Sequence, residues 1–165
     1  MEGFYVFGGK NSPEGASSSL KILQYDYSSR GLTWIYPSVK GVPPKARYHH
    51  NMVYYPELEC LMVVGGISVG KDKDKDIRVD HFAILNLETL VWSIPHMMGR
   101  EGFPSRFGHC SCIYNEQLMV FGGKAENRQF AFGLDYVELS NYHHILFMVN
   151  NFSQFNRSRR GKSEV

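Results

Sequence analysis

The sequence lacks the usual features of secreted, membrane-spanning and nucleic-acid-binding proteins. It holds only three cysteines, none of them in a CxxC pair, so we expect free thiols and a reducing compartment. No apolar run reaches the length of about 18 residues that a spanning helix needs, and the N-terminus does not read as a secretory signal. The 18 basic and 16 acidic side chains nearly balance. We therefore expect a cytoplasmic protein whose partners are neither nucleic acid nor membrane.

Sustained helical periodicity is also missing, and strand signals take its place. Apolar residues make up 43% of the chain and aromatic residues 14%, which is enough to bury a core and excludes an intrinsically disordered chain. Val, Ile, Tyr, Phe and Met occur in runs of about five to eight residues between Gly, Pro, Asn and Ser. This pattern predicts an all-β fold.

The chain repeats itself. A double glycine follows an apolar run three times, 57 residues apart each time, at Gly8–Gly9, Gly65–Gly66 and Gly122–Gly123. Other landmarks keep nearly the same interval, namely Trp34 and Trp92 (58 residues), Arg47 and Arg106 (59), and His50 and His109 (59). Because several independent landmarks agree, the interval indicates a structural repeat.

Each complete unit is predicted to hold four antiparallel strands. The expected strands are residues 49–55, 58–66, 79–87 and 90–95 in one unit, and 109–114, 117–123, 131–139 and 143–150 in the next. The first unit has only three strands and starts directly at residues 3–9. The predicted organisation is therefore a partial unit (1–40), a full unit (41–98), a full but degenerate unit (99–150) and a basic, disordered tail (151–165).

The glycines, tryptophans and histidines of the repeat are predicted to be structural. A glycine pair at the end of a buried strand permits positive φ and lets another backbone or ring approach closely. Trp34 and Trp92 fall in the outermost strand of their units, where a large ring can cover the gap between adjacent sheets. His50 and His109 are assigned the same kind of role.

The order GxPPxARYxH, strand, VVGG, polar loop, strand and Trp resembles the kelch repeat. That resemblance implies four-stranded antiparallel blades of a kelch-type β-propeller, here an incomplete ring of about three. The third copy departs from the pattern, with Phe147 or Met148 where Trp is expected. The matching residues are Gly41, Pro43, Pro44, Ala46, Arg47, His50, Gly65, Gly66 and Trp92, and again Gly102, Pro104, Arg106, His109, Gly122 and Gly123.

Three units are too few to close a ring, since propellers close with about four to eight sheets. The terminal sheets are expected to leave an apolar face and an unpaired edge, and both need a partner. A fragment of a longer polypeptide is the favoured explanation. The alternatives are two or more copies that complete a ring together, and a non-functional remnant.

No metal, cofactor or catalytic set is predicted. The sequence from Gly65 to Asp72 nearly matches a phosphate-binding loop, but a carboxylate replaces the hydroxyl that would hold magnesium. Along a strand, Cys110 and Cys112 face one way and His109 the other, so we expect packed structural thiols. The alternating charges of residues 71–76 are either a solvated loop or a recognition loop.

The favoured function is a non-catalytic scaffold or adaptor that presents blade loops to a protein or peptide. Arg47 and Arg106 have two interpretations: they satisfy loop carbonyls, or, as the resemblance implies, they line a face where peptides dock. Lys10, Lys71 and Lys124 follow the glycines and are further candidate binding residues. The resemblance also implies an enzymatic alternative, a copper oxidase or sugar isomerase, although the carboxylates do not converge. The basic tail is either inert or a nuclear import signal.

Overall fold

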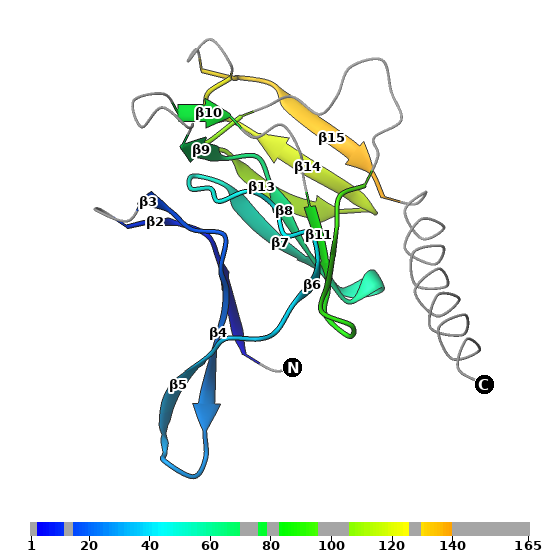
Figure 1. Cartoon of the computed structure of the whole chain (residues 1–165). Coiled ribbons are helices and arrows are strands. Elements are labelled where there is room, and N and C mark those ends of the chain that lie inside the picture. The colour runs from blue at the N-terminus through cyan, green and yellow to red at the C-terminus, as the bar shows by residue number, and fades with distance from the viewer. Residues whose placement is uncertain are drawn as a thin grey trace, which may run out of the picture.

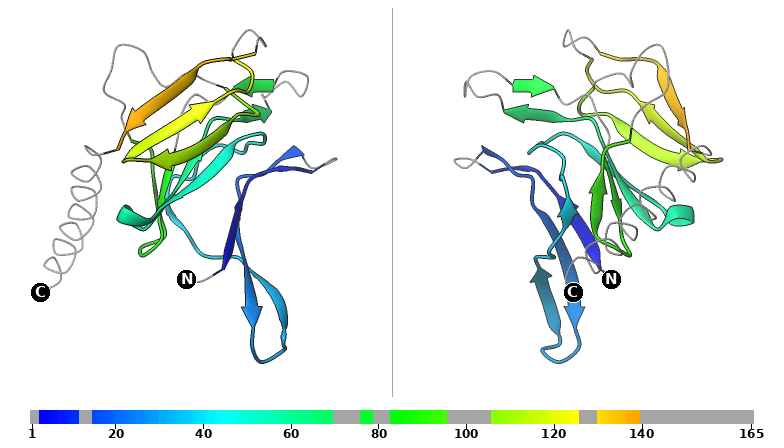
Figure 2. Two further views of the ribbon diagram at one scale, coloured as in Figure 1. Left: turned by 180° about the vertical axis from the view of Figure 1, so that it is seen from behind. Right: turned by 45° about the vertical axis from the view of Figure 1, so that its right-hand side comes forward.

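The computed structural model describes residues 3–11, 15–69, 76–78, 83–95, 106–125 and 130–139 of the chain. Regular structure in these residues consists of β-strands and one short 3-10 helix, η1 (Pro56–Leu58). Most of the strands belong to three antiparallel sheets that fan out side by side (Figure 1; Figure 2). This arrangement confirms the prediction of an all-β chain built from repeated sheets.

The first sheet has three strands, as predicted for the N-terminal unit. Their order is β1 (Phe4–Phe7), β4 (Leu20–Asp26) and β5 (Gly31–Ile35). Between β4 and β5 the side chain of Asp26 accepts hydrogen bonds from the Ser28 amide (2.9 Å) and the Ser29 hydroxyl (2.6 Å), which fixes the turn and lowers the pKa of Asp26. Within the described residues β1 pairs with β4 alone, so its other edge is open.

The second sheet holds the four predicted strands and one more. Its order is β6 (Lys40–Gly41), β12 (Val91–Ser93), β11 (Ala83–Asn86), β8 (Cys60–Val64) and β7 (Asn51–Tyr55). The short β6 runs parallel to β12 at the outer edge. A Cβ at Gly41 would lie 2.3 Å from the Trp92 carbonyl oxygen, and φ there is +75°, so this close pairing requires glycine.

The third sheet is described for three of its four predicted strands. They are β13 (Cys110–Tyr114), β14 (Gln117–Phe121) and β15 (Leu134–Glu138). Asn115 and Glu116 both take positive φ, as the two-residue turn of a tight hairpin requires. The predicted strand at 143–150, with Phe147 and Met148, lies outside the described residues.

A short hairpin follows each glycine doublet. The first is formed by β2 (Lys10–Asn11) and β3 (Gly15–Ala16), and the second by β9 (Ile67–Val69) and β10 (Asp76–Arg78). In the third sheet Lys124 bridges to Phe130 at the same place. The first two hairpins lie at the same end of the sheets in Figure 1. The segments predicted as polar loops therefore begin as paired strands.

Two apolar clusters join the sheets. One, between the first and second sheets, contains Phe7, Leu20, Leu61, Val63, Ala83, Leu85 and Trp92. The other, between the second and third, contains Tyr55, Cys60, Met62, Val64, Ile84, Leu118, Val120 and Leu139. Residues alternate along β8 between the two clusters, so all five side chains of this strand are buried. The middle sheet is thus covered on both faces.

The two tryptophans occupy equivalent strands and differ in burial. Trp92 is 3% exposed and packs on Phe7 of the first sheet, with ring centroids 5.1 Å apart. The prediction that tryptophan covers the gap between sheets holds for this residue. Trp34 is 48% exposed, because its face of the first sheet has no described neighbour to cover.

Candidate functional site

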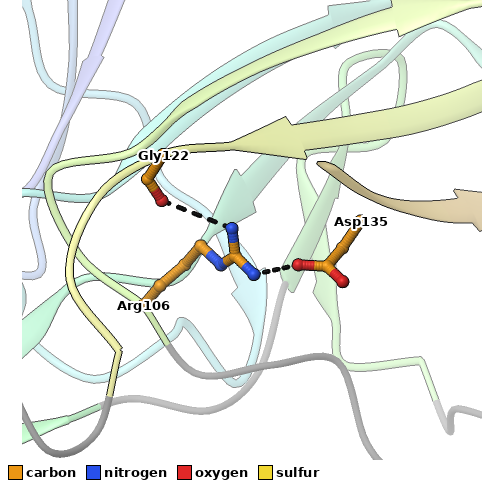
Figure 3. A network of polar contacts seen from close by, with 3 residues as sticks. All are labelled: Arg106, Gly122 and Asp135. Carbon is orange, nitrogen blue, oxygen red and sulfur yellow. Dashed lines mark hydrogen bonds and ion pairs between the residues drawn. The ribbon is translucent and has the colours of Figure 1, made fainter. Parts of the chain in front are cut away.

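The arginine that precedes each complete inner strand holds the glycine doublet of its own sheet. The Arg47 guanidinium donates a hydrogen bond to the Gly65 carbonyl (2.9 Å), and that of Arg106 donates to the Gly122 carbonyl (3.3 Å). Arg106 also forms an ion pair with Asp135 of β15 (Figure 3). The two arginines are 2% and 5% exposed, and their burial lowers the pKa of both, that of Arg47 to about 10.

The backbone of the same arginine holds the doublet of the preceding sheet. The Gly9 amide donates to the Arg47 carbonyl (2.8 Å), and the Gly66 amide donates to the Arg106 carbonyl (3.0 Å). One Arg-x-x-His segment therefore bridges two neighbouring doublets, with its side chain on one and its carbonyl on the other. This contact repeats at both junctions between sheets.

The doublets are glycine because these segments approach so closely. A Cβ at Gly65 would lie 2.4 Å from the Arg106 carbonyl oxygen and 2.7 Å from the His109 ring. A Cβ at Gly66 would lie 2.8 Å from Cβ of His50. Both glycines have positive φ, +58° and +105°. The predicted conformation and the predicted close approach are both present at this doublet.

The two repeat histidines are buried at these junctions. Burial, followed by the charge of the nearby Arg47, lowers the pKa of His50 to about 4; burial and the charge of Arg106 do the same for His109. The His50 ring also meets the Phe7 ring edge-on, with centroids 5.8 Å apart. Both histidines are therefore neutral near pH 7 and serve as packing groups.

The candidate arginines thus satisfy loop carbonyls, which is the structural one of their two interpretations. Contact with a partner stays a prediction for both. Sequence reasoning missed the ion pair between Arg106 and Asp135. These residues are 29 positions apart, and no motif links them.

The candidate lysines stand beside aromatic rings. Nζ of Lys10 lies 4.9 Å from the centre of the Tyr48 ring, and Nζ of Lys124 lies 5.1 Å from that of Phe130. Neither ring was singled out from the sequence, although each follows or precedes a repeat landmark closely. Lys71 lies outside the described residues. Two of the three lysines are therefore placed by cation–π contacts at the ends of the hairpins.

The cysteines do not share one environment. Cys60 is buried, and burial raises the pKa of its thiol to about 12. Cys110 and Cys112 lie on one face of β13, as alternation predicts, but they are exposed. The expectation of packed thiols is wrong for this pair, because their face of the third sheet is not covered by a described neighbour. Within the described ranges, no three His, Cys, Asp or Glu side chains are grouped as metal ligands would be.

A groove of about 730 Å³ separates the open edge of the first sheet from the second sheet. Phe4 and Tyr5 of β1 line one side, and Met52 and Tyr54 of β7 line the other. Glu59 and Glu88, from the turns of the second sheet, complete the lining together with Gly3, Leu61 and Leu87. No helix among the described residues is long and apolar enough to cross a membrane.

Comparison with known proteins agrees with the sheet architecture. A probable serine/threonine-protein kinase of Dictyostelium discoideum is 30% identical over 126 residues, covering 75% of this chain and 9% of the relative. The Rab9 effector protein with kelch motifs of Gallus gallus is 31% identical over 121 residues, covering 73% of this chain and 30% of the relative. The chain thus spans a third or less of the length of these relatives.

The solved structure of YjhT superposes on 82% of this chain with a TM-score of 0.60 at 14% identity, using 40% of its own chain. That likeness shows the shared fold. The family model of the Attractin/LZTR1 beta-propeller matches residues 1–143. The sheets, the glycine doublets and this match together establish that the chain belongs to the Attractin/LZTR1 beta-propeller family, as a partial propeller of kelch type.

Proposed function

We propose that the chain is a non-catalytic protein-interaction module that presents the hairpins after its glycine doublets to a protein or peptide partner. The observation that carries this proposal is the repetition of one basic hairpin end. Lys10 and Lys124 occupy equivalent positions in the first and third sheets, and each lies against an aromatic ring. Side chains held in this way on a rigid sheet lose less freedom on binding than free lysines do.

The hairpin ends favour a partner segment with carboxylates. Each lysine offers an ammonium group, and Phe130 and Phe132, which are exposed beside Lys124, offer apolar contact. Lys71 stands at the equivalent place after the second doublet in the sequence and is proposed to add a third positive charge. Relatives with kelch motifs support an interaction role in general terms. The kinase match covers 9% of that protein, so its activity gives no support to catalysis here.

The test is selection of peptides from a random display library on the purified chain. We expect the selected peptides to be acidic and to bind the double variant Lys10→Glu, Lys124→Glu about tenfold or more weakly, because each reversal replaces attraction with repulsion. Lys40→Glu is the matched control, since Lys40 is an exposed lysine on β6, away from the hairpins. Peptides that bind both variants equally well would contradict the proposal. Stoichiometric copper in the purified protein would favour the enzymatic alternative instead.

A further inference from the structure

The first sheet lacks an element that the other two sheets possess. In the second sheet, β7 pairs with β8 and is preceded by Arg47 and His50; in the third, β13 pairs with β14 and is preceded by Arg106 and His109. In the first sheet, β1 is the equivalent of β8 and β14, and within the described residues its outer edge pairs with nothing. The contacts that the missing element would make can be read from the two complete sheets.

The second glycine of each doublet records whether that element is present. A Cβ at Gly66 would meet the Tyr48 carbonyl oxygen at 3.0 Å, and a Cβ at Gly123 would meet that of Phe107 at 2.6 Å. A Cβ at Gly9 would meet no atom within 4 Å, although φ there is +95°. Gly9 keeps the backbone conformation of an occupied doublet while the space above it is open.

The backbone just after each doublet gives a second record. Ile67 exchanges hydrogen bonds with Tyr48 (2.8 and 2.9 Å), and Lys124 exchanges them with Phe107 (2.9 and 3.2 Å). Lys10 is the equivalent residue of the first sheet and is paired only with Ala16, on its other side, in the described chain. Its backbone on the open side is therefore available to an incoming segment.

The groove between β1 and β7 gives a third record. In the complete part of the array the inner strands β7 and β13 pack beside each other. The groove lies on the opposite side of β7, between Met52 and Tyr54 of β7 and Phe4 and Tyr5 of β1. Its position is that of an inner strand of the first sheet.

We propose that the open edge of β1, together with Gly9 and Lys10, is a docking site for an extended polypeptide segment from outside these 165 residues. The segment carries an arginine, a histidine three residues later, and then a strand of about five residues that pairs antiparallel with β1, as β7 pairs with β8. Its arginine donates to the Gly8 carbonyl, as Arg47 does to that of Gly65. Alternate side chains of its strand fill the groove.

A second copy of the chain cannot fill this site without opening another. Each copy has three glycine doublets and only two Arg-x-x-His segments that lead into an inner strand. The remaining Arg-x-x-His, Arg78 to His81, leads into β11, which is already paired on both sides in the second sheet. Any inner strand that one copy lends to another leaves an equal vacancy behind, so the occupant has to be a different polypeptide segment.

The test measures binding of a labelled peptide with the sequence of residues 45–55, the chain's own inner strand with its arginine and histidine, to the full chain. We expect saturable binding that weakens about tenfold or more in the chain variant Gly9→Ala, because the new Cβ occupies the place of the peptide backbone. Gly15→Ala is the matched control, since Gly15 has a similar φ of +87°, equally open space and a place in the same hairpin. A peptide in which the equivalents of Arg47 and His50 are alanine should also bind about tenfold or more weakly.

Equal binding by the Gly9→Ala and Gly15→Ala chains, or by the two peptides, would overturn the proposal, as would a stable dimer by light scattering that no longer takes up peptide. If Gly9→Ala does not fold, hydrogen exchange on the unsubstituted chain decides the question. The peptide should then slow exchange in β1 and leave β5 unchanged. Protection that appears only elsewhere contradicts the proposed site.

Discussion

The middle sheet and the two end sheets are built from nearly the same sequence and reach different degrees of burial. The strand before the doublet reads LMVV in the second sheet, LMVF in the third and FYVF in the first. All five residues of β8 are buried, β14 alternates between buried and more exposed positions, and only Phe7 is buried in β1. The pattern of apolar residues is therefore set by the repeat, whereas the burial of each residue depends on which neighbours are present.

The exposed faces of the end sheets belong to positions that are core in the middle sheet. Phe4 and Val6 of β1 are exposed, but their equivalents Leu61 and Val63 are buried against the first sheet. Phe121 is exposed at the other end, while its equivalent Val64 is buried. Apolar faces of this kind are characteristic of surfaces that other protein covers. The following variants compare matched positions in the middle and at the ends.

The largest contrast is expected for the tryptophans. Trp92→Ala should destabilise the fold by about 3–5 kcal/mol, because it removes a buried ring from the cluster between the first two sheets. Trp34→Ala should cost less than about 1 kcal/mol, since nearly half of this side chain is already in contact with water. Unfolding in guanidinium chloride measures both values. Equal losses would show that the two sheets are not in different environments.

The next effect is a dependence of stability on pH that arises at the junctions between sheets. The pKa of His109 is about 4 in the folded chain and about 6.5 in the unfolded chain, so the unfolded chain binds more protons between these values. Stability is then complete above pH 6.5 and falls as the pH falls towards 4, by up to about 3 kcal/mol for this group. Denaturant titrations at several pH values should show the slope, and His109→Gln should reduce it. His49→Gln is the control; an equal reduction in that variant would contradict the assignment.

A smaller contrast is expected between equivalent glycines. Gly65→Ala and Gly122→Ala both place a side chain at positive φ, +58° and +69°, which costs about 1–2 kcal/mol in each. Only Gly65→Ala also collides with the Arg106 carbonyl and the His109 ring, and we expect about 1–3 kcal/mol more from that overlap. Thermal unfolding of the two variants checks the difference. A larger loss in Gly122→Ala would contradict the open space above that glycine.

The sequence was sufficient to predict the strands, their grouping into sheets and the conformation of the doublets, because these depend on features that recur every 57 residues or so. The exposure of Trp34, Cys110 and Cys112 could not be predicted in the same way. These residues have the spacing of core positions, and their exposure follows from what lies beside the sheet. The ion pair of Arg106 with Asp135 was missed because it depends on the pairing of β14 with β15 and not on a local motif.

The central claim is that three similar sheets stack in a row and that each shields the apolar face of its neighbour. Hydrogen exchange, resolved by residue, tests it most directly, because amide protection reports local opening. We predict that the amides of β8 exchange most slowly, through global unfolding, and that those of β1, with one paired edge and a face open to water, exchange much faster. Equal protection in β1 and β8, or faster exchange in β8, would contradict the stacked arrangement.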